Sequence, residues 1–134
     1  MAEEGGYLHE AQSSLTPATL DNHRAYRSLM EEIEAIDWYA QRIDATDDAD
    51  LKAVLAHNRD EEKEHAAMVL EWLRRRDPVL DRHLRTYLFT SAPITEIEER
   101  VEAANGDQDA APRLRPAGGG DASLEIGSLR DRTP

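Results

Sequence analysis

Residues 58–73, NRDEEKEHAAMVLEWL, decide the fold because they place acidic side chains and a histidine inside an apolar helical pattern. Along this part of the chain one set of residues recurs at alternating steps of four and three, the spacing that keeps one stripe of a helix facing a partner. The members of this stripe are Leu51, Leu55, Asn58, Glu62, His65, Val69 and Trp72. Glu62 and His65 therefore occupy positions where the pattern calls for Leu or Ile.

A carboxylate or imidazole in such a stripe needs a compensating partner. Burying either group in charged form without one costs several kcal/mol. A bound cation held by Glu62 and His65 would supply the missing charge. The alternative is a stripe rotated by one residue, which would leave both side chains solvated, as most glutamates are. From this helix alone the two interpretations are equally supported.

The composition excludes several kinds of site and partner. The 134 residues include 28 acidic and 16 basic side chains, for a formal net charge of -12. This balance argues against a nucleic-acid groove or an anionic membrane surface and is compatible with attracting cations. The chain has no cysteine, so any metal must use oxygen and nitrogen ligands. No apolar run approaches the roughly 18 residues of a spanning helix, and no export signal is indicated, so we expect a cytoplasmic protein.

The pattern predicts an all-α chain whose main feature is an antiparallel two-helix hairpin. Residues 1–15 show no sustained period and are expected to form a flexible lead-in or at most a frayed turn. Thr16 and Pro17 are a capping residue and a first-turn proline, and they predict a long helix to about Asp44. A short polar connection then leads into a second helix over about residues 49–76, which turns back along the first.

Short helices and a tethered peptide are predicted after the hairpin. A third helix is expected over about residues 78–89, and a last amphipathic turn or two over 94–101, which completes a helical domain over 16–101. Residues 102–122 are rich in Gly and Pro and predict a disordered linker. Apolar residues return in 123–134, either as a tail without a role or as a docking peptide for another protein.

The first helix carries a matching stripe, and it too includes a carboxylate. Its members are Ala25, Leu29, Glu32, Ile36, Tyr39 and Ile43. A hairpin with one apolar face cannot keep that face dry, so the simplest completion is a second copy related by a two-fold axis, giving a four-helix bundle. Glu32, Glu62 and His65 from both copies would then form the ligand set of ferritin-like di-iron carboxylate proteins. Iron or manganese suits these ligands, and zinc also fits.

Other polar residues near these stripes have weaker support as metal ligands. Tyr39 lies seven residues after Glu32 and is either a donor or weak ligand beside the metal or a packing aromatic. Glu31 and Glu34 would form a cation-capture site at the edge of the bundle. A second such cluster consists of His57, Glu61 and Glu64. For both clusters a solvated helix face is the favoured interpretation.

Three segments together carry a family resemblance. Residues 30–39, MEEIEAIDWY, and 58–68, NRDEEKEHAAM, closely resemble the encapsulated ferritins. Residues 124–130, LEIGSLR, resemble the peptide that directs cargo into encapsulin shells. The resemblance covers about residues 20–100 and the tail. It implies a ferroxidase that oxidises ferrous iron with dioxygen at a di-iron centre between two chains and feeds mineral storage inside an encapsulin nanocompartment.

The resemblance also assigns residues and partners. In that family the positions of Glu32, Glu62 and His65 ligate iron, Tyr39 adjoins them, and Glu31 with Glu34 serve metal uptake. The family assembles as a ring of dimers, typically a decamer of five. Shell docking would use Leu124, Ile126, Gly127, Ser128, Leu129 and Arg130. Half of the bundle is missing from this chain, so no self-made storage cage is expected, and a non-catalytic metal-binding cargo or a structural adaptor remain the alternatives.

Overall fold

The computed structural model describes residues 7–109, and these form helices and connecting turns with no strand. The elements are the short 3₁₀ helix η2 (Gln12–Ser14), α1 (Pro17–Ala45), α2 (Ala49–Arg74), α3 (Pro78–Tyr87) and α4 (Ile94–Asp109). The chain divides into two compact units, one ending at Thr90 and one beginning at Ser91. The predicted all-α class is confirmed. None of the described helices is both long and apolar enough to cross a membrane.

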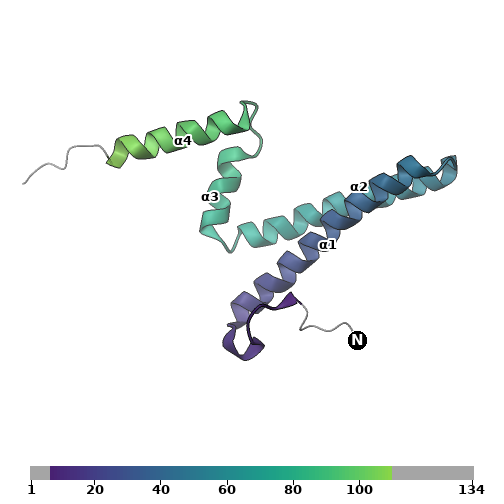
Figure 1. Ribbon diagram of the computed structural model, residues 1–134, viewed down its shortest axis with the longest axis horizontal. Coiled ribbons are helices and arrows are strands. Elements are labelled where there is room, and N and C mark those ends of the chain that lie inside the picture. The colour runs from purple at the N-terminus through teal and green to yellow at the C-terminus, as the bar shows by residue number, and fades with distance from the viewer. Residues whose placement is uncertain (1–6, 110–134) are drawn as a thin grey trace, which may run out of the picture. The chain divides into compact units, whose positions relative to one another are not determined.

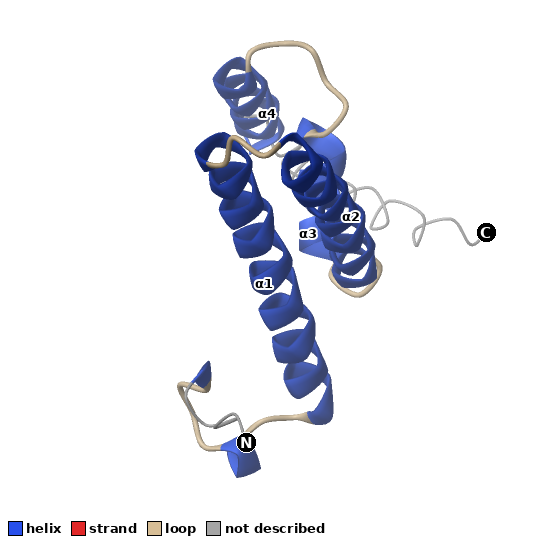
Figure 2. Cartoon of the chain, turned by 90° about the vertical axis from the view of Figure 1, so that its right-hand side faces the viewer, coloured by secondary structure: helices blue, strands red, loops and turns tan. Residues whose placement is uncertain are grey.

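Side-chain caps fix the start of both long helices. The backbone amide of Thr19 donates to the Thr16 hydroxyl oxygen at 3.2 Å, and proline occupies the first position of α1. The amide of Leu51 donates to the Asp48 carboxylate at 2.8 Å and so caps α2. α1 and α2 pack against each other as an antiparallel hairpin (Figures 1 and 2). The predicted hairpin is therefore present.

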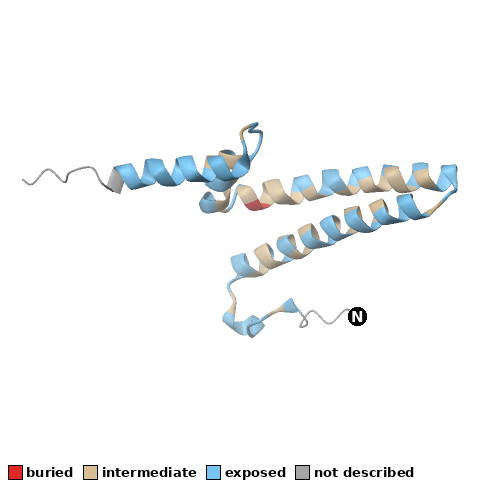
Figure 3. Ribbon diagram, turned by 45° about the horizontal axis from the view of Figure 1, so that its top comes forward, coloured by how far each residue is buried: buried red, intermediate tan, exposed pale blue. Residues whose placement is uncertain are grey.

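The burial pattern follows the predicted stripes, and half-buried patches recur along α1 and α2 in Figure 3. All six predicted positions of α1 are half-buried. In α2 the half-buried members are Leu55, Asn58, Glu62, Val69 and Trp72. Leu51 and His65 are exposed in the single chain. The half-burial of Glu62 supports the predicted register over the register rotated by one residue.

The hairpin encloses very little by itself. Leu73, 2% exposed, is the one fully buried hydrophobic residue in the range that the structure describes. Large apolar side chains that remain exposed on α1 and α2 are Tyr26, Met30, Ile33, Trp38, Leu51, Val54 and Met68. A core of this size is too small to stabilise a separate domain, so these residues indicate a packing face that the single chain leaves open.

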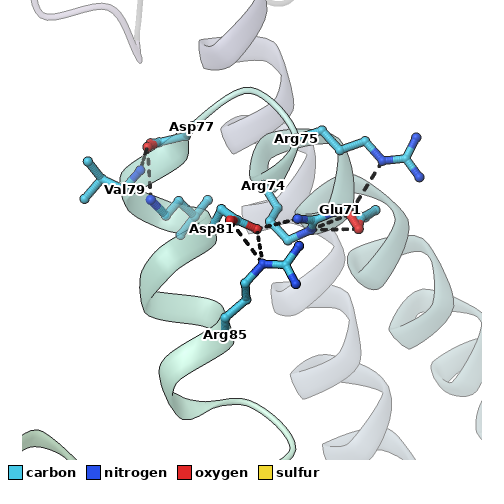
Figure 4. Close-up of polar contacts among 8 residues, drawn as sticks. Glu71, Arg74, Arg75, Asp77, Val79, Asp81 and Arg85 are labelled. Carbon is cyan, nitrogen blue, oxygen red and sulfur yellow. Dashed lines mark hydrogen bonds and ion pairs between the residues drawn. The ribbon is translucent and has the colours of Figure 1, made fainter. Parts of the chain in front are cut away.

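A network of charged residues joins α3 to α2. Asp77 caps α3 by accepting hydrogen bonds from the amides of Val79 and Leu80, both at 3.0 Å. Arg74, in the last turn of α2, donates to Glu71 at 2.8 Å and also bonds Asp81 of α3, as Figure 4 shows. The Arg74 guanidinium is the main reason that the pKa of Asp81 is lowered. This contact fixes the corner between the two helices.

Two helix ends differ from the sequence prediction. α3 ends at Tyr87, and Phe89 has a left-handed φ of 59°, which does not continue a helix. The prediction that the last helix ends at 101 and that a linker begins at 102 is wrong, because α4 continues to Asp109. Gly106 is unfavourable in a helix by about 1 kcal/mol relative to Ala, which the helix formers before it offset. The rest of the predicted linker and the peptide 123–134 lie outside the described residues.

Candidate metal centre

Three side chains from the two long helices meet within the hairpin. Glu32 comes from α1, and Glu62 and His65 come from α2. One ligand atom from each of them lies within 4.8 Å of the others. His65 Nδ1 is 3.4 Å from Glu62 Oε2 and 3.8 Å from Glu32 Oε2. The structure thus brings together the three residues that the sequence analysis selected, while their role as ligands stays a prediction.

Helix geometry explains why these residues converge. Residues three apart on a helix are neighbours on its surface, so Glu62 and His65 project from the same face of α2. The antiparallel pairing of α1 with α2 then brings Glu32 to this face at mid-length of the hairpin. The cluster therefore depends on regular structure and needs no loop to hold it, a favourable basis for a metal site.

The cluster is partly buried and remains open to solvent. The side chains of Glu32 and Glu62 are 24% and 22% exposed, whereas that of His65 is 49% exposed. Two half-buried carboxylates beside one exposed imidazole make a site with free coordination positions. A single chain therefore supplies only part of a closed coordination sphere.

The two carboxylates shift each other's pKa in opposite directions. The hydrogen bond with Glu62, together with burial, raises the pKa of Glu32. Accepting this hydrogen bond lowers the pKa of Glu62, and His65 contributes in the same direction. Two ionised carboxylates this close repel each other, and this repulsion also raises the pKa of Glu32. A divalent cation would relieve the repulsion and satisfy both groups.

The donor set fits a particular class of metal. Two carboxylates and an imidazole are hard oxygen and borderline nitrogen ligands, which suit ferrous iron, manganese and zinc. His65 presents Nδ1 to the carboxylates, and its unprotonated form can donate a lone pair to a metal. Carboxylate ligands bind a metal in the ionised form, so protonation of Glu32 would compete with metal binding.

The remaining predicted residues lie outside this cluster. Tyr39 is half-buried, and its ring centre is 5.5 Å from the guanidinium carbon of Arg42. Glu31 pairs with Arg27 at 3.6 Å, and Glu34 is exposed. Among the described residues, the group that could hold a metal ion includes none of these side chains.

The second acidic cluster has the features of a solvated face. His57 Nε2 lies 2.9 Å from Glu61 Oε1, with side chains 70% and 52% exposed, and Glu64 is also exposed. This arrangement agrees with the favoured interpretation of these residues as surface groups.

Tyr7 and Arg27 form a contact at the side of α1 that was not predicted from the sequence. The Arg27 guanidinium carbon lies 3.6 Å from the centre of the Tyr7 ring. The spacing of four between Arg27 and Glu31 was a visible signal for an ion pair. The contact with Tyr7 had no such signal, because it depends on how the segment before α1 folds back.

Comparison with known proteins gives a consistent group of relatives. A sequence model of the EncFtn-like family matches residues 7–91. The encapsulated ferritin-like protein of Rhodospirillum rubrum is 55% identical over 130 residues, which cover 97% of this chain and 92% of that protein. The encapsulin nanocompartment cargo protein EncC of Myxococcus xanthus is 40% identical over 129 residues, covering 87% of this chain and 93% of the relative. The crystal structure of protein ne0167 from Nitrosomonas europaea matches with a TM-score of 0.65 and 58% identity, covering 66% of this chain and 97% of that one.

Proposed function

Because the chain belongs to the EncFtn-like family, we propose that it is a ferroxidase, which oxidises ferrous iron with dioxygen at a di-iron centre shared by two chains. The observation that carries this proposal is the convergence of Glu32, Glu62 and His65 from two helices. Iron is the substrate as well as the metal bound. The donor set suits ferrous iron, and the names of the relatives point to ferritin-like chemistry.

The proposed site is completed by a second copy. Two hairpins related by a two-fold axis would place four carboxylates and two imidazoles inside one bundle, the ligand set of ferritin-like di-iron proteins. Two features of the single chain support this pairing. His65 is 49% exposed although it lies in the predicted stripe, and apolar residues such as Met30 and Met68 lie exposed on the same hairpin. Five such dimers in a ring would give the decamer that the resemblance implies.

The roles of the three residues follow from their environments. Glu62 of each chain would bridge the two ions, because it lies close to both other ligands. Glu32 would bind terminally in its ionised form, and His65 would complete the set. Negative ligands stabilise ferric iron more than ferrous iron, because the attraction grows with the charge of the ion. The site therefore favours loss of one electron from each ion to dioxygen.

Residues around the centre would serve uptake and support. We assign Glu31 and Glu34 to the capture of ferrous iron, since both carboxylates lie exposed on α1 beside Glu32. Tyr39, two turns after Glu32 in the half-buried stripe, would adjoin the iron ligands. These assignments rest on position along α1 and on the family resemblance.

The chain is also proposed to act as cargo of an encapsulin shell. A relative that is 40% identical is named an encapsulin nanocompartment cargo protein. Residues 124–130, LEIGSLR, would bind the shell, with Leu124, Ile126 and Leu129 entering pockets and the residues before them acting as a tether. The ferric product would then be mineralised inside the compartment.

The test is oxidation of iron by the full chain. Anaerobic protein is loaded with ferrous iron and exposed to air, while ferric absorbance and dissolved oxygen are followed. We expect oxidation well above that in buffer, loss of the increase in Glu32→Ala, and no change in Glu98→Ala, which removes an exposed carboxylate of α4. A wild-type rate equal to that of buffer would refute the ferroxidase.

The same experiment separates the alternative functions. Iron-dependent association without oxygen consumption would select a non-catalytic metal-binding cargo. Absence of specific metal binding across the pH range would select a structural adaptor that only presents the tail. An unchanged rate in Glu32→Ala would show that oxidation, if present, occurs elsewhere on the chain.

A further inference from the structure

Tyr7, Arg27 and Glu31 form a chain of contacts at the side of α1. The guanidinium carbon of Arg27 lies 3.6 Å from the centre of the Tyr7 ring, well inside the distance of about 6 Å within which a cation is attracted by an aromatic face. On its other side, Arg27 Nη2 lies 3.6 Å from Glu31 Oε1. The guanidinium is thus held between an aromatic ring and a carboxylate.

The Arg27 side chain is mostly buried, although that of its ion-pair partner Glu31 is exposed. The side chain of Arg27 is 24% exposed, whereas that of Glu31 is 64% exposed. Arg24, one turn earlier, also pairs with a carboxylate but is 65% exposed. An exposed arginine exchanges freely between its partner and water, and such pairs contribute little. The Tyr7 ring removes part of this freedom, so the charge of Arg27 stays beside Glu31.

This fixed charge lies at the carboxylates assigned to iron uptake. Arg27, Glu31 and Glu34 are spaced by four and three residues, so they share one face of α1. Glu31 precedes Glu32 of the metal cluster directly in the chain. A cation that approaches Glu31 therefore meets a positive group already paired with it.

We propose that Arg27, held by the Tyr7 ring, is a fixed counter-ion of Glu31 that a metal cation must displace before it reaches Glu32. This inference rests on the proposed function, which supplies the cation, and makes Arg27 a positioning residue for uptake. Repulsion between a single and a double charge about 6 Å apart in water corresponds to about a tenfold change in binding constant. With salt screening we expect about three- to tenfold. The outer carboxylates then capture cations weakly enough to pass them on.

Terbium(III) luminescence can measure this effect directly. Trp38 lies four residues after Glu34 and so on the same side of α1, where it can sensitise terbium bound at the outer carboxylates. The full chain is titrated with terbium alone, and the Glu31→Gln variant identifies the signal of this site. Arg24→Gln is the matched control, because it removes the same charge from an arginine that no aromatic ring of residues 7–109 covers. Circular dichroism verifies that each variant keeps its helices.

Terbium carries three charges, so the same repulsion without screening corresponds to about a thirtyfold change, and Arg27→Gln should bind terbium about five- to thirtyfold more tightly than wild type. Tyr7→Ala should shift binding in the same direction by less, and Arg24→Gln should match wild type. The Arg27 effect should vanish in a Glu31→Gln background. Equal affinity of Arg27→Gln and Arg24→Gln, or an effect that persists without Glu31, would overturn the inference. If Arg27→Gln does not fold, the test rests on Tyr7→Ala. A terbium affinity of Tyr7→Ala equal to that of wild type would then overturn the inference. Because terbium is not oxidised, failure of the ferroxidase would instead appear as wild-type iron oxidation no faster than in buffer.

Discussion

Replacing Leu73 by alanine should lower the free energy of unfolding by about 3 kcal/mol. Leu73 is 2% exposed, the most enclosed residue in the described range. Full burial of a leucine is worth about 1.5–3 kcal/mol, and the cavity left by Leu→Ala raises the cost to about 2–5 kcal/mol. We expect a middle value, since the small interior of the hairpin leaves its walls free to relax into part of the space.

Urea unfolding followed by far-UV circular dichroism measures this change. For a slope of about 2 kcal/mol per molar urea, a loss of about 3 kcal/mol lowers the midpoint by about 1.5 M. Wild type and variant are compared at one protein concentration, because association adds to the apparent stability of each. The slope should not change, which would show that both chains expose the same surface on unfolding.

Val79→Ala is the matched control. Val79 lies in the first turn of α3 and is 53% exposed, so its truncation should change the free energy of unfolding by no more than about 0.5 kcal/mol. Equal midpoints for the two variants would refute the reasoning, since the enclosed position at the end of α2 would then contribute no more than an exposed one.

Three further predictions concern protons, the α2–α3 corner and the tail. Zinc affinity should fall as pH decreases through the raised pKa of Glu32, because protonation of this carboxylate competes with metal binding. Calorimetry should show this step in wild type, and an equal step in Glu32→Gln would contradict it. Arg74 lowers the pKa of Asp81, so Asp81 contributes stability that is present above its unfolded pKa and lost as pH falls through its folded pKa. Asp81→Asn should therefore speed amide exchange in α3 at neutral pH and remove the loss of stability in acid. Protection of the α3 amides equal to that of wild type at neutral pH would argue against the contact. Deleting residues 123–134 should abolish co-purification with an encapsulin shell and leave iron oxidation unchanged, and a truncated chain found inside the shell would disprove this.

The hairpin and the convergence of the cluster could be predicted because both depend on local periodicity. Steps of four and three fix which residues share a stripe, and a short polar connection forces α2 back along α1. Once both stripes face the same way, Glu32 must come close to Glu62 and His65, as the structure shows. The half-burial of Glu62, which selects the register, required the packed helices.

The contacts of single arginines could not be predicted in the same way. Arg74 lies in the last turn of α2, and its bond to Asp81 depends on the angle at which α3 leaves α2. The stacking of Arg27 on Tyr7 likewise depends on the path of the segment before α1. The helical continuation through Gly106 was missed because glycine has a low helix propensity that its neighbours override.

Because the interior of the hairpin is small, the assembly of the proposed metal centre depends on protein concentration. Within residues 7–109 Leu73 alone is fully buried. On the proposed two-fold pairing, a chain therefore folds and completes its metal centre in one step that requires two chains to meet. Each tenfold dilution then removes about 1.4 kcal/mol from the stability of the pair. At low concentration the chains would stay unpaired, and proteases would degrade them before they could oxidise iron. Confinement of many copies in one compartment would raise their local concentration and so keep the oxidising site assembled.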